Sequence, residues 1–381
     1  MEIRDDGIPV GGQKKFVGIL ELSECERYGQ LISRDDNGKE DIANPYVGMD
    51  ILCKYHLRRG QQISAAILPR TSFPNPRVLS VEKIDGMDPD ARNRRTPFDR
   101  LTPVQPRKQM LLECGESSMP SRVIDLFCPI GKGQRGIIAS PPRSGKTMLL
   151  HEISKSISKN FPEIPIVVAL IDERPEEVTD FKRSVTAEIY ASSNDQGPKN
   201  HIRVARLAGE RARNLAESGR DVILFIDSIT RLARAHNATG GSGRTMTGGI
   251  DSRAMEIPRK MFAMARDTEH GGSLTILATA LIETGSKMDD LIFQEFRGTG
   301  NLEIVLNRKL AEMRLWPAID LQASGTRHEE LILSPQMCAG VSFLRRAFAG
   351  MEPEKAMELL LNRLSAHKSN NEFLAMIAKP S

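Results

Sequence analysis

The sequence contains few cysteines, few aromatic residues and no long apolar run. Its five cysteines are scattered and form no CxxC pair, which argues against disulfides and structural zinc and favours a reducing compartment. The longest apolar run, residues 164–171, is far too short to cross a bilayer, and the charged N-terminal residues are unlike a signal peptide. We therefore expect a cytoplasmic protein without a membrane partner.

Neither sign of charge predominates in the chain. The 53 Lys and Arg residues against 49 Asp and Glu residues give a formal net charge of +4, which permits nucleic-acid binding without implying it. A length of 381 residues is enough for two domains with sizeable cores, and 40% hydrophobic and 27% charged residues are ordinary for a globular protein. Composition therefore leaves the function to local motifs.

The pattern of apolar residues divides the chain into four segments. After a short tail at residues 1–14, residues 15–86 hold short strand-like runs separated by turns with Gly and Asn, which is typical of a small barrel of the OB or cold-shock kind. Residues 87–120 form a basic, proline-containing linker whose charge serves either solubility or the path of a polyanion. From residue 121 to 381, strands alternate with helical patterns, which predicts an open α/β sheet.

The most informative segment runs from Ser140 to Thr147. It follows an apolar strand-like run and opens a helical stretch, which is the context of a phosphate-binding P-loop. Backbone N–H groups of such a loop point at phosphate oxygens, Lys146 supplies a charge for the β- and γ-phosphates, and the Thr147 hydroxyl binds Mg²⁺. Ser140 stands where the pattern has Gly. The residues expected to cradle the nucleotide are Ser140, Pro141, Pro142, Arg143, Ser144, Gly145, Lys146 and Thr147.

Acidic residues follow two apolar runs at suitable spacing downstream. Residues 164–171 precede Asp172 and Glu173, and residues 221–226 precede Asp227. Because ligands bind beyond the carboxyl ends of parallel strands, we expect Asp227 to hold the Mg²⁺ shell and Glu173 to orient the attacking water. The alternative is that these acids only cap the following helices, as Asp and Glu often do.

Two polar loops of the second domain carry cations. Residues 238–249 are rich in glycine around Arg244, and residues 284–287 end in Lys287 after a strand-like run. A Gly-rich segment is often a mobile linker. On a nucleotide-hydrolysing domain, a Gly-rich loop with a cation is alternatively a device that grips a polyanionic backbone.

Several longer runs carry a resemblance to a known family. Besides the P-loop, they are residues 129–136 (PIGKGQRG), 171–178 (IDERPEEV), 227–234 (DSITRLAR), 271–275, 284–289 and 324–327 (SGTR). With these runs the chain resembles bacterial transcription termination factor Rho over nearly its whole length. The resemblance implies a RecA-like ATPase domain after an RNA-binding barrel. It also implies a homohexamer that uses ATP and Mg²⁺ to move 5′ to 3′ along RNA and to displace RNA polymerase, in company with elongation factors.

The resemblance also implies roles for four arginines. Arg327 resembles an arginine finger that reaches into the neighbouring subunit's nucleotide site, and Arg314 belongs to the same interface. Arg174 and Arg231 resemble supporting arginines of the catalytic site, and Arg174 is also expected near the nucleotide. For Arg231 and Arg314 taken singly, the alternative is an ordinary solvated surface residue.

The implied RNA contacts lie in two places. In the barrel, Tyr28 and Tyr46 resemble aromatic stacking platforms, although Gln30 stands where the family carries a second closely spaced aromatic. Base stacking contributes about 1–3 kcal/mol per base, so one missing platform weakens RNA capture by an order of magnitude or more. In the motor domain, Arg244 and Lys287 fall in the two loops that the resemblance places along the hexamer pore.

Trp316 is the single tryptophan of the chain. By default a large ring at any position is a core aromatic. The resemblance implies instead that Trp316 stacks on adenine while Met148, just after the P-loop, packs the opposite face of the base.

Two other classes of function compete with an RNA-driven motor. Rotary and secretion-type hexameric ATPases share the P-loop, a Glu-bearing strand end and an N-terminal barrel, and fold alone does not separate them from an RNA motor. A non-catalytic RNA-binding protein with a relic P-loop is disfavoured because Lys146, Thr147, Glu173 and Asp227 are all intact. The loops with Arg244 and Lys287 favour RNA over a secretion substrate.

Overall fold

The computed structural model describes residues 14–33, 44–68, 75–114, 119–240, 249–251 and 253–377. The chain divides into two compact units. The first comprises residues 1–101 together with 207–219, and the second comprises residues 102–206 and 220–381. In the described part of the chain, every helix is too short or too polar to cross a membrane.

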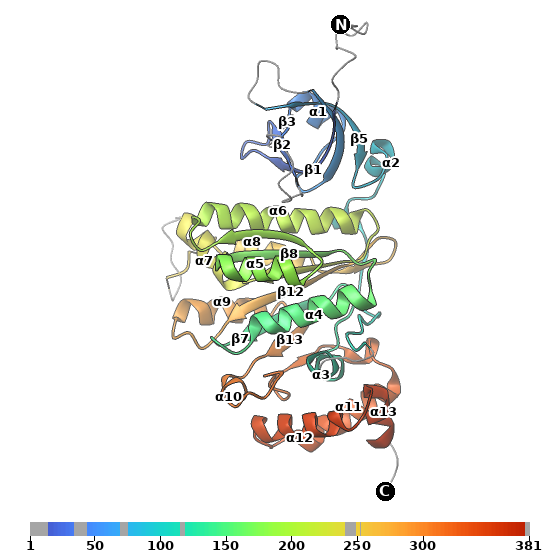
Figure 1. The fold of residues 1–381 in the computed structure, drawn as a ribbon, viewed down its shortest axis with the longest axis vertical. Helices are drawn as coiled ribbons and strands as arrows, with labels where there is room; N and C mark the ends of the chain where they lie inside the picture. The colour runs from blue at the N-terminus through green and yellow to red at the C-terminus, as the bar shows by residue number, and fades with distance from the viewer. Residues whose placement is uncertain are drawn as a thin grey trace, which may run out of the picture. The chain divides into compact units, whose positions relative to one another are not determined.

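The first unit is built on a closed five-stranded barrel (Figure 1). Its strand order is β1-β2-β3-β5-β4, with a short helix, α1 (Met49–Lys54), after β3. The strands are β1 (Lys14–Leu22), β2 (Gly29–Ile32), β3 (Tyr46–Val47), β4 (Gln62–Leu68) and β5 (Arg77–Ile84). Gly18 allows β1 and β2 to approach closely, because a Cβ there would lie 2.8 Å from the Ile32 carbonyl oxygen. The predicted small barrel is confirmed.

Buried ion pairs lie inside this unit. Arg92, in α2 (Pro89–Asn93), donates to Glu217 over 2.7 Å and pairs with Asp85 over 3.2 Å. Arg211, in helix α6 (Pro198–Glu217), donates to the same Asp85 over 2.8 Å. All four side chains are almost fully buried. Arg92 falls in the segment predicted as a basic linker. Its charge is paired with carboxylates inside the unit and is therefore not available to a polyanion.

The second unit contains a seven-stranded sheet in the order β14-β13-β7-β12-β10-β8-β9. All neighbouring strands are parallel except β13 and β14, which are antiparallel. The strands are β7 (Arg135–Ser140), β8 (Ile166–Glu173), β9 (Glu188–Ser193), β10 (Val222–Asp227), β12 (Leu274–Leu281), β13 (Leu302–Val305) and β14 (Gly325–Thr326). The central strands are runs of Ile, Val and Leu that are buried on both faces, as parallel strands require. The predicted α/β sheet is confirmed.

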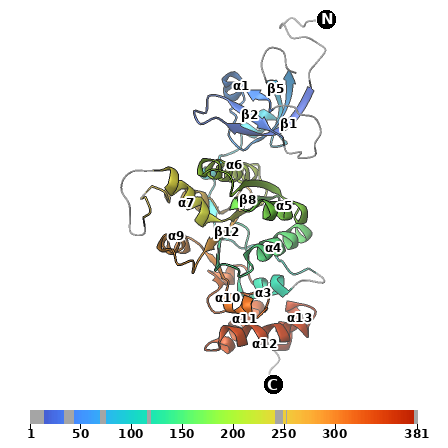
Figure 2. The same ribbon diagram turned by 60° about the vertical axis from the view of Figure 1, so that its left-hand side comes forward.

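Helices cover both faces of the sheet (Figure 2). In that view α4 and α5 lie on one side and α7 and α9 on the other. The helices of the unit besides α6 are α3 (Met119–Phe127), α4 (Lys146–Asn160), α5 (Pro175–Ser184), α7 (Ile229–Thr239), α8 (Glu256–Ala263), α9 (Lys287–Arg297), α10 (Arg308–Glu312), α11 (Pro335–Phe348), α12 (Pro353–Ser365) and α13 (Asn370–Ile377). A small ribbon, β6 (Pro103–Val104) with β11 (Asp267–Thr268), and two 3₁₀ turns, η1 (Phe98–Arg100) and η2 (Glu329–Leu331), complete the described elements.

The strand order decides where a ligand site forms. β7 ends at Ser140, and β10 and β8 lie beyond β12 on one side of it, ending at Asp227 and Glu173. Because these strands are parallel, their carboxyl ends lie at one edge of the sheet. The P-loop therefore opens at the edge that also carries the two predicted acids.

Candidate nucleotide-binding site

The P-loop connects β7 to α4 in a conformation that glycine makes possible. Gly145 has a positive φ of 88° and immediately precedes α4. A Cβ at this position would lie 2.3 Å from Cζ3 of Trp316, so both the backbone angle and the space exclude a side chain. Ser140 and Ser144, both buried, bring their hydroxyl oxygens to 2.9 Å, and the Ser144 hydroxyl donates to the Pro141 carbonyl over 2.8 Å. At the position where the pattern has Gly, the Ser140 side chain thus links the start of the loop to Ser144.

The structure brings Lys146 together with both predicted carboxylates. Its Nζ lies 2.7 Å from Oε1 of Glu173 and 2.5 Å from Oδ1 of Asp227. Burial works to lower the pKa of Lys146, but the two carboxylates outweigh it and raise that pKa. Burial, followed by the charge of Asp227, raises the pKa of Glu173 to about 7, against the opposing effects of Lys146 and Arg231. Lys146 therefore keeps its positive charge, and Glu173 is a carboxyl group that titrates near neutrality.

Thr279 supports this arrangement and was not predicted from the sequence. Its hydroxyl, at the carboxyl end of β12, donates to Oδ1 of Asp227 over 2.7 Å, and both residues are buried. β12 pairs directly with β10, which brings the two side chains together. Thr279 and Thr275 are the two polar residues of the otherwise apolar β12, and this was the available signal, but the partner of Thr279 depends on the strand order.

Two of the four predicted arginines flank the acids. Arg231, in the first turn of α7, places Nη1 3.5 Å from Glu173 and 3.9 Å from Asp172. Arg174 is exposed and stands at the N-cap of α5, directly after Glu173. Asp172 has a positive φ of 57°, and the pairing of β8 with β9 shifts register at this point. This irregularity changes the course of the backbone at the end of β8, next to Glu173, the predicted catalytic carboxylate.

The donor atoms at the loop suit magnesium. Thr147, in the first turn of α4, offers a hydroxyl, and Asp227 offers a carboxylate at the end of β10. Mg²⁺ prefers such hard oxygen ligands and usually completes its shell with water and substrate phosphates. These two residues therefore fit the ion in the company of a bound nucleotide.

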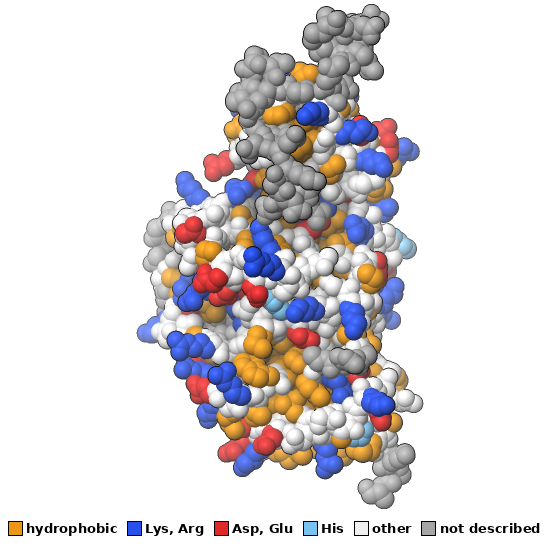
Figure 3. Space-filling view, viewed as in Figure 1, with side chains coloured by type: hydrophobic (Ala, Val, Ile, Leu, Met, Phe, Trp, Pro, Cys, Tyr) orange, Lys and Arg blue, Asp and Glu red, His pale blue; other side chains and the backbone are white. Residues whose placement is uncertain are grey.

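A small apolar pocket of about 70 Å³ adjoins the P-loop. Trp316 and Met148 line it together with Gly145, and its other lining residues are Pro120, Ser144, Leu149, Glu152, Leu306, Pro317 and Ala318. Met148 is 63% exposed, whereas Trp316 is half-buried and packs against the main core. Hydrophobic side chains also gather between α4 and α12 on the face drawn in Figure 3. Trp316 thus has one side on the protein core and an edge at the loop, and its contact with adenine stays a prediction.

The two arginines predicted for a subunit interface lie apart from this group. Arg327 follows β14 at the edge of the sheet, is exposed, and donates its backbone N–H to the Asn301 carbonyl over 2.8 Å. Arg314 is exposed and has a positive φ of 60° just before Trp316. Within the described residues, neither side chain forms a hydrogen bond or ion pair with Lys146. Their predicted action across subunits is untested by a single chain.

The predicted RNA contacts are partly visible. Tyr28 and Tyr46 stack with ring centroids 5.7 Å apart at 26°, and their exposed fractions are 43% and 36%. Gln30 pairs with Tyr46 in the β2–β3 register. Lys287 is exposed at the start of α9. Arg244 lies outside the described residues.

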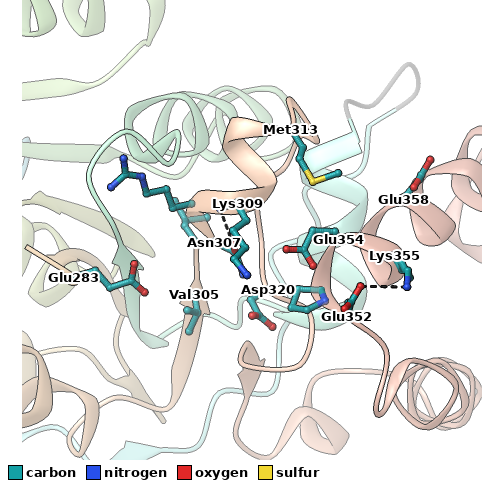
Figure 4. A pocket seen from close by; sticks show the side chains of 13 residues that line it. Glu283, Val305, Asn307, Lys309, Met313, Asp320, Glu352, Glu354, Lys355 and Glu358 are labelled. Atoms are coloured by element: carbon teal, nitrogen blue, oxygen red, sulfur yellow. Dashed lines mark hydrogen bonds and ion pairs between the residues drawn. The ribbon is translucent and has the colours of Figure 1, made fainter.

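A further pocket, of about 710 Å³, lies beside β13, α10 and α12 (Figure 4). Five acidic side chains line it against three basic ones, and an ion pair joins Glu352 to Lys355 over 3.2 Å. None of the residues predicted to bind nucleotide, magnesium or RNA is among its lining residues. This acidic pocket shares only Leu306 with the small pocket beside the P-loop.

Comparison with known proteins places this site in a family. Residues 121–326 match the nucleotide-binding domain of the ATP synthase alpha/beta family. The transcription termination factor Rho of Aquifex aeolicus is 45% identical and covers 94% of this chain and 83% of its own length. That of Bacillus subtilis is 44% identical, with 94% and 84% covered. This chain belongs to the transcription termination factor Rho family.

Other matches mark the limits of this assignment. The Rho protein of Mycobacterium tuberculosis is 46% identical over 99% of this chain, which spans only 63% of that relative. Among solved structures, an ATPase of a type III secretion system is 25% identical with a TM-score of 0.61, covering 74% of this chain and 86% of its own. An ATP synthase subunit of Nanoarchaeum equitans, 20% identical with a TM-score of 0.55 over 65% of this chain and 63% of its own, shows the fold alone. The secretion-type alternative therefore shares the architecture but is not favoured over the Rho family.

Proposed function

We propose that this protein is an RNA-dependent ATPase that moves 5′ to 3′ along nascent RNA and terminates transcription by displacing RNA polymerase. The observation that carries the proposal is the grouping of Lys146, Glu173 and Asp227 at a P-loop in a chain of the Rho family. The stacked, exposed tyrosine pair of the barrel supports single-stranded RNA as the activating ligand. We propose that it acts in the cytoplasm and that elongation factors are among its partners.

The hydrolytic site works by positioning charges. Nucleotide phosphates draw Lys146 from its two carboxylates, while Thr147 and Asp227 hold magnesium. When bound, Mg²⁺ polarises the phosphoryl oxygens as a Lewis acid. The carboxylate released from Lys146, Glu173, then accepts a hydrogen bond from water and orients it toward the γ-phosphate. Trp316 and Met148 hold the adenine at the apolar pocket beside the loop.

The active species is a homohexamer in which each nucleotide lies between two subunits. Arg327, exposed after the edge strand β14, supplies its guanidinium to the γ-phosphate bound by the neighbouring subunit. Arg314 stands at the same interface. RNA captured by Tyr28 and Tyr46 continues into a pore where Lys287 and Arg244 contact its backbone.

The proposal is tested by ATP turnover with and without single-stranded RNA. We expect single-stranded RNA to stimulate hydrolysis strongly and duplex DNA to have little effect, with half-saturation that weakens as salt increases. A secretion-type ATPase would hydrolyse ATP without responding to RNA. Turnover that is unchanged by RNA of any sequence would favour that alternative.

A further inference from the structure

The loop that carries Arg327 has little secondary structure of its own. It follows β14, a strand of only two residues at the edge of the sheet, and His328 has a positive φ of 56°. Two hydrogen bonds hold its start: the Thr326 hydroxyl donates to the Pro129 carbonyl, and the Arg327 N–H donates to the Asn301 carbonyl, both over 2.8 Å. After Arg327 the chain passes into η2, where the N–H groups of residues 331–333 donate to the carbonyls of His328 and Glu329. These bonds are local and do not join this end of the loop to the core.

Arg345, eighteen positions later on α11, supplies that attachment. Its Nη1 donates to the Ser324 carbonyl over 3.1 Å, before Arg327, and its Nη2 lies 3.4 Å from Oε2 of Glu329, after Arg327. The same Nη2 donates to the Phe127 carbonyl at the end of α3 over 2.7 Å, and the guanidinium lies 5.4 Å from the Phe127 ring centroid. One planar fork therefore joins both sides of the loop to the core.

The surroundings favour this geometry over other partners. Burial raises the pKa of Glu329, and the charge of Arg345 works against that rise, so the pair is partly withdrawn from water. Phe127 is fully buried and stacks on Phe348 of α11 with centroids 6.2 Å apart. The Arg345 guanidinium therefore lies against a buried, packed part of the core. Arg327 itself is exposed beside a pocket of about 500 Å³.

We propose that Arg345 is a positioning residue for Arg327, fixing the loop from Ser324 to Glu329 so that Arg327 reaches the nucleotide of the adjacent subunit. The inference rests on the proposed trans role of Arg327. A guanidinium displaced by about 1 Å loses on the order of 100-fold in rate, so the attachment has a catalytic consequence. If Arg345 only joined α11 to α3, its loss would lower stability without a signature across subunits.

The test uses Arg345→Met in the full chain, with Arg346→Met as matched control. Arg346 is the next residue of the same helix and is exposed. We expect Arg345→Met rings to bind ATP analogue as the wild type does, and to lose on the order of 100-fold in kcat with little change in KM. Arg346→Met should keep wild-type kcat. Should Arg345→Met fail to fold, Arg345→Lys, which keeps the charge but loses the fork, replaces it throughout.

Mixed hexamers provide a measurement that separates the two roles. If Arg345 had only a structural role, activity would not recover when its variant is mixed with another. A ring of Arg345→Met and Glu173→Gln subunits contains interfaces where an intact Glu173 meets a well-placed Arg327 from the other variant. We expect activity to recover in these mixtures, as in mixtures of Arg327→Ala with Glu173→Gln. Mixtures of Arg345→Met with Arg327→Ala should not recover, because both lack a working Arg327.

Two failures are distinguishable. Wild-type turnover in Arg345→Met overturns the positioning role, and so does its failure to recover with Glu173→Gln while Arg327→Ala does recover. If Arg327→Ala itself never recovers in confirmed mixed rings, the trans role of Arg327 is wrong, and the inference falls with it.

Discussion

At the scale of single residues, Lys146 and Glu173 have different tasks. Lys146→Ala removes the charge that holds the phosphates, so nucleotide binding and turnover should both be lost. Glu173→Gln keeps the volume and removes only the group that orients water, so it should retain ATP and reduce turnover by several orders of magnitude. Equilibrium binding of a fluorescent ATP analogue, measured beside steady-state hydrolysis, separates the two. Equal loss of binding in both variants contradicts this division.

The acidity of Glu173 predicts a pH dependence. Burial and then Asp227 raise its pKa from 4.5 to about 7, so in the free protein Glu173 loses its proton only as pH rises through about 7. Since the carboxylate form is the active one, kcat/KM for ATP, which reports the free enzyme, should rise with pH over this range and then level off. The residual activity of Glu173→Gln should lack that rise. A flat wild-type profile between about pH 6 and 8 opposes the assignment.

At the scale of elements, sequence patterns predicted what is local. The strand–loop–helix context gave the P-loop, and apolar runs ending in acids gave the ends of β8 and β10, because parallel strands place such ends at one edge. Thr279 and Arg345 escaped prediction because their partners are set by non-local pairing: β12 lies beside β10, and α11 lies against α3. The two-residue strands β3 and β14 are too short to leave a periodic pattern.

Thr279 offers a test of that non-local support. Thr279→Val is nearly isosteric and removes the hydroxyl that donates to Asp227. A hydrogen bond to a charged group contributes about 1.5–3 kcal/mol, so kcat should fall by about tenfold or more if Asp227 is then misplaced. Thr275→Val is the control, because this buried hydroxyl on the same strand accepts from the Gly133 N–H instead. It should lower thermal stability and leave kcat nearly unchanged; equal kcat losses in both would deny Thr279 a specific role.

At the scale of the whole molecule, the fold is shared by proteins with different tasks. The chain resembles a secretion ATPase in architecture over 74% of its length, yet a shared fold does not imply a shared function. What assigns this chain to a family is its Rho-like sequence. The exposed tyrosine pair of the barrel is the feature on which the proposed RNA binding depends. The architecture alone therefore does not separate an RNA motor from another ATPase of this fold, and RNA-stimulated turnover is the measurement that does.

The barrel makes the last prediction, on RNA capture. Tyr28 and Tyr46 form one stacked platform, and Gln30 lies opposite Tyr46 in the β2–β3 register. Because stacking contributes about 1–3 kcal/mol per base, Tyr28→Ala should weaken binding of single-stranded RNA by about tenfold. Gln30→Phe should tighten it by adding a ring beside Tyr46. Val17→Ala, which truncates an exposed apolar residue of β1, serves as the control.

The measurement is fluorescence anisotropy of a labelled single-stranded RNA with the full chain at fixed salt. RNA-stimulated ATP turnover should follow the same order, with Gln30→Phe reaching half-stimulation at the lowest RNA concentration and Tyr28→Ala at the highest. The maximal rate should stay constant, because these residues act on capture and leave the P-loop untouched. Binding by Tyr28→Ala that equals that of Val17→Ala would move the RNA site away from this face of the barrel.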